Sequence, residues 1–132
     1  MERKTITSPD APAAIGAYSP AVRIDGAGGL VFCSGQLGMD PKTGELVEGG
    51  VEAQAEQAMA NLGALLEASG LGWGSVVRAT LYLTDMADFA KVNAVYAKRF
   101  PNNPPARVAI GVAALPKGAA FEVDAIAVAA AL

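Results

Sequence analysis

The sequence predicts a single α+β domain in which two helices cover one face of a mixed β-sheet. Two segments carry apolar residues at helical spacing, and three later segments alternate apolar and polar residues as half-buried strands do. The elements follow in the order strand, strand, strand, helix, strand, helix, strand, strand, which is typical of an α+β fold. A chain of 132 residues suits one domain, so we expect residues 1–132 to fold as a unit.

The first third of the chain is expected to form three short strands. The proline-containing segment Ser8–Pro12 interrupts regular structure after the first of them. Residues 25–29 are rich in glycine and predict a hairpin turn between the second and third strands. Gly35 is expected to end the third strand. The three strands are placed at residues 3–8, 22–24 and 30–34.

Two helices are expected, at residues 51–68 and from about residue 86 to 100. Asp85 is suited to cap the second helix, and Pro101 lies just beyond its end. The apolar face of the first helix comprises Val51, Ala55, Ala58, Met59, Leu62, Leu65 and Leu66, and that of the second comprises Phe89, Val92, Tyr96 and Phe100.

The remaining strands are expected near residues 75–84, 107–112 and 121–128. In the first of them Val77, Ala79, Leu81 and Leu83 share a face. Val108, Ile110 and Val112 likewise share a face, so Arg107 and Ala109 are expected on the opposite one. If Phe121 and Val123 meet the helices, Glu122 joins Arg107 on the uncovered face, beside Ile126 and Val128. Leaving such an apolar face in water costs about 25 cal/mol per Å², which predicts a homo-oligomer whose subunits cover each other's sheets.

Composition excludes several classes of function. The chain has no histidine, which removes the usual catalytic triads and the commonest metal ligand, and Cys33 is the only cysteine. The net charge of −3 and the lack of a basic run give no support for nucleic-acid binding. The N-terminus has no signal-like segment, and the apolar C-terminal run Ala125–Leu132 is too short to cross a bilayer. We therefore expect a cytoplasmic protein without a membrane partner.

Arg107 and Glu122 are the candidate functional pair. A guanidinium offers paired donors that fit a carboxylate, and a glutamate can move protons or orient water. The alternative is a structural ion pair between Arg107 and Glu122 or Asp124 at an interface. Cys33 lies in an apolar strand and is interpreted as a small buried side chain.

Several segments, in order along nearly the whole chain, resemble one family. They are Ala11–Pro20, Cys33–Gln36, Asn61–Leu62, Thr84–Asn93, Pro105–Arg107 and Leu115–Gly118 through to Ala127. The sequence resembles the RidA (YjgF/YER057c/UK114) family of reactive-intermediate deaminases. The resemblance implies a chorismate-mutase-like α+β fold and a homotrimer with active sites between subunits. It also implies hydrolysis of enamines and imines, such as 2-aminoacrylate and 2-iminopropionate, to 2-oxo acids and ammonia without a cofactor or metal.

The resemblance also implies residue roles. Arg107 would bind the substrate carboxylate, Glu122 would orient or activate water, and Tyr18 and Gly35 would line the pocket. Ala109 stands where the family often has cysteine, so only a backbone role is expected of it. Alternatively, Tyr18 is a loop aromatic packed at an interface, and Gly35 serves only the strand end. Gly111 stands where a larger polar residue is frequent, which would widen the pocket or change its selectivity.

Two further functions stay open at this point. The same cleft would suit a non-catalytic protein that binds 2-oxo acids or similar small metabolites. An endoribonuclease activity is also attached to the family, although the acidic chain without histidine argues against it.

Overall fold

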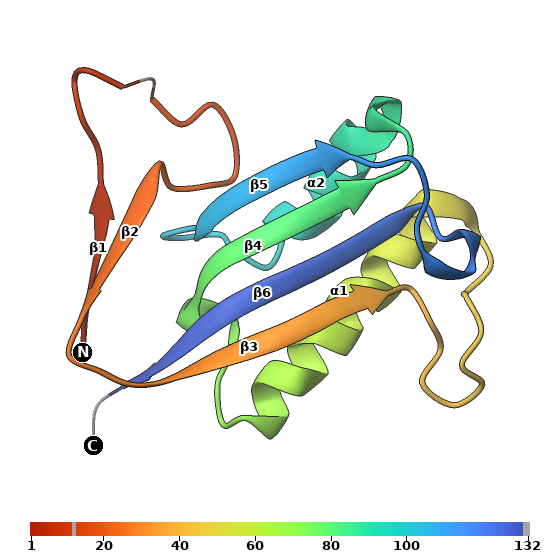
Figure 1. Ribbon diagram of the computed structural model, residues 1–132, viewed down its shortest axis with the longest axis horizontal. Helices are drawn as coiled ribbons and strands as arrows, with labels where there is room; N and C mark the ends of the chain where they lie inside the picture. The colour runs from red at the N-terminus through yellow and green to blue at the C-terminus, as the bar shows by residue number, and fades with distance from the viewer. Residues whose placement is uncertain (12, 131–132) are drawn as a thin grey trace.

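Two helices lie behind one face of a four-stranded sheet (Figure 1). The computed structural model describes residues 1–11 and 13–130. Its helices are α1 (Gly50–Ala68) and α2 (Phe89–Ala97), and its sheet consists of β3 (Ala27–Leu37), β4 (Val76–Leu83), β5 (Ala106–Gly111) and β6 (Phe121–Ala130). The predicted α+β arrangement and element order are confirmed. Pro12 and the last two residues of the C-terminal apolar run lie outside the described residues, so a single domain over 1–132 stays a prediction.

The strand order of the sheet is β3-β6-β4-β5. The last strand, β6, lies between β3 and β4 and runs antiparallel to both, whereas β4 and β5 are parallel. Parallel neighbours need a crossover connection, and α2 provides it by returning the chain from the end of β4 to the start of β5. The functional candidates on β5 and β6 are thereby separated by the central strand β4.

The N-terminal hairpin forms a separate two-stranded sheet. Here β1 (Glu2–Ile6) pairs with β2 (Ala21–Asp25), from Glu2 opposite Asp25 to Ile6 opposite Ala21. The predicted hairpin between the second and third strands is therefore wrong, because β3 turns away at Gly26 and pairs with β6. Gly26 has a φ of +69°, a left-handed conformation that glycine adopts without a steric penalty.

The core lies between the helices and the sheet. Its largest fully buried aliphatic side chains come from both layers, and each contributes about 1.5–3 kcal/mol relative to exposure. They are Met59, Leu62, Leu66, Val76, Leu81, Leu83, Val92 and Val123. Two details were wrong: Leu65 is 40% exposed, and a register shift between Val76 and Arg78 puts Val76, not Val77, in the core. Cys33 packs against the core as expected, and partial burial raises the pKa of its thiol.

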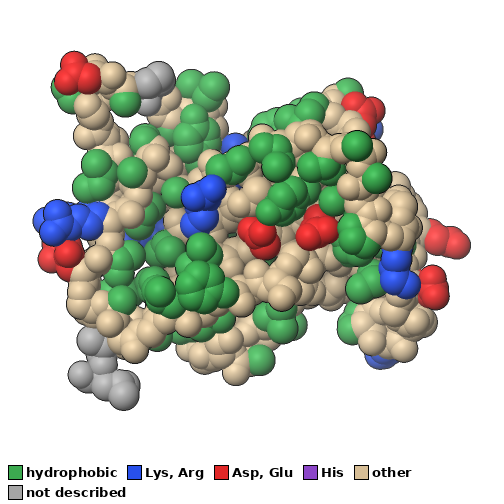
Figure 2. Space-filling view, viewed as in Figure 1, with side chains coloured by type: hydrophobic (Ala, Val, Ile, Leu, Met, Phe, Trp, Pro, Cys, Tyr) green, Lys and Arg blue, Asp and Glu red, His purple; other side chains and the backbone are tan. Residues whose placement is uncertain are grey.

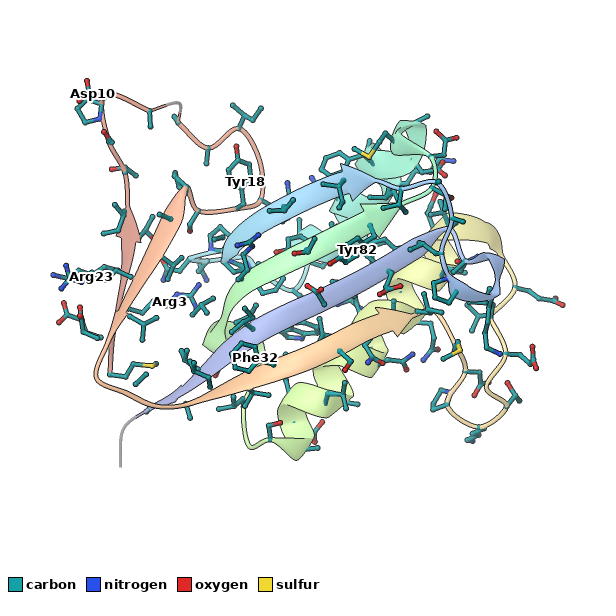
Figure 3. The ribbon with its side chains drawn as sticks, in the orientation of Figure 1. Arg3, Asp10, Tyr18, Arg23, Phe32 and Tyr82 are labelled. Atoms are coloured by element: carbon teal, nitrogen blue, oxygen red, sulfur yellow. The ribbon has the colours of Figure 1, made fainter. Side chains whose placement is uncertain are left out.

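Much of the other face of the sheet is uncovered, as the sequence predicts, but Val128, which was expected to be uncovered there, is only 3% exposed. Leu30, Phe32 and Ile110 are 58%, 70% and 39% exposed. Figure 2 shows hydrophobic side chains gathered over this face, and Phe32 and Tyr82 project from it in Figure 3. In a monomer, this apolar area would be exposed to water.

Within the described residues, neither helix has the length and apolar character needed to cross a bilayer. The cytoplasmic location expected from the sequence stays a prediction.

Candidate functional site

Arg107 lies on the helix side of the sheet. It pairs in register with Ala79, a core residue of the parallel strand β4, and its side chain contacts α2. The expectation that it shares the open face with Glu122 is therefore wrong. The alternation of the sequence predicts that Val108 and Ile110 face the helices, but β5 is an edge strand. There the helix layer leaves room for a long polar side chain, and Ala109, two residues on, packs against the core.

The guanidinium of Arg107 is enclosed by neutral groups. Its Nη1 donates a 2.6 Å hydrogen bond to Oδ1 of Asn93. The carbon at its centre lies 5.1 Å from the ring centroid of Tyr96, 5.3 Å from that of Tyr18 and 5.4 Å from that of Phe89. Aromatic faces attract a cation at this range. Burial lowers the pKa of Arg107, but a guanidinium stays protonated at neutral pH.

No carboxylate neutralises Arg107 within the described part of the chain, where the ion pairs join other residues. Within one chain, among the described residues, Arg107 makes no ion pair with Glu122 or Asp124, and the alternative of such a pair at an interface stays a prediction. A half-buried cation whose neighbours are an amide and three rings retains donors for an external anion.

The loop before β2 brings Tyr18 to this position. The backbone N–H of Ser19 donates a 2.9 Å hydrogen bond to the carbonyl of Pro105, and its hydroxyl donates to the carbonyl of Pro104. These bonds fasten the loop to the segment that leads directly into β5 and Arg107. Figure 3 shows Tyr18 beside the beginning of β5. Tyr18 thus lies beside Arg107 within one chain, and its role in lining a substrate pocket stays a prediction.

Tyr96 has an unpartnered hydroxyl beside the arginine. The residue is 1% exposed, and its oxygen has no hydrogen-bond partner among the described residues. Burial raises the pKa of Tyr96, so its hydroxyl stays protonated and is available as a donor. A buried hydroxyl without a partner costs about 1–3 kcal/mol. A bound molecule that accepted from it would remove this cost.

Glu122 lies on the open face, directly against the backbone of Gly35. A Cβ added to Gly35 would lie 1.9 Å from Oε2 of Glu122, so only glycine allows the carboxylate to approach this closely. The expectation that Gly35 ends its strand is wrong, since β3 continues to Leu37. Its register with β6 shifts between Cys33 and Gln36, however, which leaves Ser34 and Gly35 in a bulge opposite β6. Bulges of this kind commonly lie next to active sites.

Two neighbours accompany Glu122 on the open face. Tyr82 lies opposite it in the β4–β6 register, and the hydroxyl of Tyr82 donates a 2.8 Å hydrogen bond to Oδ2 of Asp124. This hydrogen bond raises the pKa of Tyr82. A carboxylate oxygen of Asp124 therefore accepts a hydrogen bond from Tyr82, whereas Glu122 has no ion-pair partner among the described residues.

The predicted site residues thus form two groups on opposite faces of the sheet. The arginine half-site comprises Arg107, Tyr18, Phe89, Asn93 and Tyr96, with Ala109 next along its strand face. The glutamate half-site comprises Glu122, Gly35, Tyr82 and Asp124. Sequence reasoning did not identify Asn93 or Phe89 as site residues. The signal available was Asn93 itself, an amide one turn beyond Phe89 on the apolar stripe of α2.

Known proteins are similar to this chain over almost its full length. The chain is 56% identical to protein DfrA of Myxococcus xanthus over 97% of both chains. It is also 52% identical to the 2-iminobutanoate/2-iminopropanoate deaminase of Rattus norvegicus, over 96% of this chain and 90% of the relative.

Solved structures also resemble this chain over almost its full length. RidA from a Psychrobacter species is 46% identical with a TM-score of 0.72, covering 95% of this chain and 98% of that one. TdcF of E. coli, solved with bound serine, is 39% identical with a TM-score of 0.71 and the same coverage. A family model described as Endoribonuclease L-PSP matches residues 8–129. The resemblance found in the sequence is confirmed: the chain belongs to the Endoribonuclease L-PSP family, which includes the RidA deaminases.

Proposed function

We propose that this protein hydrolyses reactive enamines and imines that carry a carboxylate, such as 2-aminoacrylate and 2-iminopropionate, to 2-oxo acids and ammonia. Relatives about half identical to it carry the name of this activity. The observation that supports the proposal most directly is the half-buried Arg107, whose neighbours are uncharged.

Arg107 binds the substrate carboxylate in this proposal. Asn93 occupies Nη1, and the three rings hold the guanidinium in place without neutralising it. Charge-assisted hydrogen bonds from the free edge of the guanidinium would fix the substrate's orientation. The structure of TdcF contains serine, an amino acid with the same carboxylate next to a nitrogen-bearing carbon.

Glu122 assists the water. The enamine first becomes its imine tautomer, and water then adds to the imine carbon, so that a C–O bond forms while the nitrogen takes up a proton. Collapse of the carbinolamine breaks the C–N bond and releases ammonia and the 2-oxo acid. A carboxylate at this position accepts a proton from water and returns it to the leaving nitrogen. The bulge at Gly35 leaves space for that carboxylate.

A homotrimer would join the two half-sites. Within one chain they lie on opposite faces of the sheet, so Arg107 of one subunit needs Glu122 of a neighbour. The uncovered face with Leu30, Phe32 and Ile110 offers the apolar surface for that contact. The partners proposed are therefore two further copies of this chain and a small carboxylate-bearing imine, with neither nucleic acid nor a membrane.

The direct test generates 2-aminoacrylate in situ and follows release of ammonia and pyruvate. The wild-type protein should raise the rate well above that of buffer, and Arg107→Ala should remove the effect. A wild-type rate equal to that of buffer, across imines derived from several amino acids, would contradict the proposal.

The second candidate is a protein that binds such metabolites without turnover, which the serine in TdcF favours. Calorimetric titration with 2-oxobutyrate, run beside the deaminase assay, separates the two. Binding that depends on Arg107 without any turnover would favour the metabolite-binding function.

The family description also names endoribonucleases. A net charge of −3 gives an RNA backbone little attraction. RNA cleavage that persists through purification and disappears in Glu122→Gln would favour a nuclease instead.

A further inference from the structure

Helix α1 carries a row of polar side chains that faces the end of β3 and the segment before β6, next to the glutamate half-site. Gln54, Gln57 and Asn61 occur at positions i, i+3 and i+7, so they share one face of the helix. All three are half-buried, unlike the exposed Glu52 on the same helix. We call these three residues the amide stripe. Amides partly removed from water need hydrogen-bond partners.

Asn61 holds the end of β3. Its Nδ2 donates hydrogen bonds of 3.1 Å to the carbonyl of Leu37 and 2.9 Å to that of Met39. Gln57 donates a 2.8 Å hydrogen bond to Oδ1 of Asn61. This second bond fixes which way the Asn61 amide points, since its oxygen must face Gln57 and its nitrogen must face the strand.

Gln54 holds the approach to β6. Its Oε1 accepts a 2.8 Å hydrogen bond from the backbone N–H of Ala120, two residues before Glu122. The chain after β3 also touches the helix here, since a Cβ on Gly38 would lie 2.5 Å from Cα of Gln54. One face of α1 therefore holds residues 37–39 at the end of β3 and residue 120 just before β6.

These hydrogen bonds lie close to the contact between Gly35 and Glu122. Leu37 lies opposite Glu122 in the β3–β6 register, and the bulge at Ser34 and Gly35 precedes it by two residues. Bulged pairs lack the regular ladder that would fix their register. We propose that the amide stripe positions the glutamate half-site by holding both strand ends where the Glu122 carboxylate meets the Gly35 backbone. This inference rests on the proposed role of Glu122 and assigns Gln54, Gln57 and Asn61 as positioning residues.

The predicted effect is on kcat and not on KM. Among the described residues, the hydrogen bonds of the stripe reach neither Arg107 nor the loop that carries Tyr18, so we expect carboxylate binding to be retained when the stripe is changed. Displacement of Glu122 lowers the rate of water attack. A residue with only a general structural role would lower the amount of folded protein without separating the two kinetic constants.

Asn61→Asp is the sharpest variant. It keeps the shape of the side chain but replaces the donor that serves Leu37 and Met39 with an acceptor. We expect kcat to fall about tenfold with KM within twofold of wild type, and amide hydrogens of residues 35–39 to exchange faster. Asn102→Asp makes the same chemical change on an exposed loop and should match wild type.

Gln54 provides a second pair of variants. Gln54→Glu keeps an acceptor oxygen for Ala120 and should retain the wild-type kcat, whereas Gln54→Leu should lower it as Asn61→Asp does. This pair keeps the inference testable if Asn61→Asp does not fold.

Two results would overturn the inference: folded Asn61→Asp and Gln54→Leu with wild-type kcat, or a loss that falls on KM. If the proposed function is wrong, the experiments give different results. In that case the wild type lacks deaminase activity, or Glu122→Gln retains it. Faster exchange at residues 35–39 in Asn61→Asp reports on the strand ends in either case.

Discussion

The arginine and glutamate half-sites are built in different ways, although both lie on the same sheet. Arg107 is fixed by side chains: an amide and three aromatic rings from α2 and the Tyr18 loop surround it. Glu122 lies against backbone instead, because the bulge in β3 and the missing Cβ of Gly35 let the main chain approach its carboxylate. A binding group benefits from a rigid aromatic enclosure, whereas a proton-transfer group needs space for water beside it.

The largest expected effects come from removing one charged group of each half-site. Arg107→Ala loses charge-assisted hydrogen bonds of about 1.5–3 kcal/mol each to the carboxylate. We expect kcat/KM to fall by about a hundredfold or more, with KM strongly raised. Glu122→Gln should lower kcat by about a hundredfold while KM changes little. Steady-state kinetics on a generated imine measures both, and a loss in Glu122→Gln that falls on KM alone would remove the distinction between the half-sites.

Mixing these two inactive variants tests whether the half-sites come from different subunits. In a cyclic trimer, each mixed assembly has one site with an intact Arg107 and an intact Glu122. Random mixing of Arg107→Ala and Glu122→Gln after dissociation should therefore restore about a quarter of wild-type activity. Each variant refolded alone is the control. Mixtures that stay at background while forming mixed trimers would show that both residues serve from the same chain.

Gly35→Ala tests the backbone side of the comparison. The added Cβ would lie 1.9 Å from Glu122 Oε2, so the carboxylate must move away. We expect kcat to fall about tenfold with stability nearly unchanged, because Gly35 does not have a positive φ. Gly29→Ala is the matched control on the same strand, since no atom lies within 4 Å of its added Cβ. Equal kinetics for the two variants would contradict the proposed contact.

Phe89→Leu tests the aromatic side and should have the smallest effect. It removes one ring from the guanidinium, a contact of about 0.5–1 kcal/mol. KM should rise two- to fivefold with kcat unchanged, according to about 1.4 kcal/mol per tenfold. Phe89→Tyr, which keeps the ring, should retain the wild-type KM. If Phe89→Tyr and Phe89→Leu are equally impaired, packing and not the ring's charge distribution controls Arg107.

Local patterns predicted the elements well, although α2 spans Phe89–Ala97 and not the expected residues 86–100. The apolar spacing of α1 gave its bounds to within one residue, and Asp85 caps the turn before α2 by accepting a hydrogen bond from the N–H of Ala87. Such features depend on residues close in the chain, where helical spacing and capping act directly. Arg107 and Glu122 were selected for their side-chain chemistry, and Tyr18 and Gly35 from the family resemblance, so none of the four came from these patterns.

Pairing and facing were predicted less well. The turn at residues 25–29 suggested a hairpin, but β3 pairs with β6, and Val31 and Cys33 of β3 pack against the core. Val108 and Ile110 are more hydrophobic than Arg107 and Ala109, yet it is the latter two that face the helix layer. Alternation gives two faces without saying which one is covered, and an edge strand with an aromatic enclosure can place a cation on the inner one.

The sequence by itself determined the α+β class, the two helices, the open apolar face of the sheet and the residues worth testing. The class, the helices and the open face follow from short-range periodicity, whereas the residues to test follow from side-chain chemistry and the family resemblance. The absence of histidine removes the usual catalytic triads. Only the tertiary structure decided that Arg107 and Glu122 lie on opposite faces, and that Asn93 and the rings of α2 surround the arginine. The reason is that long-range strand register and helix packing, which set side-chain direction, depend on residues far apart in the chain.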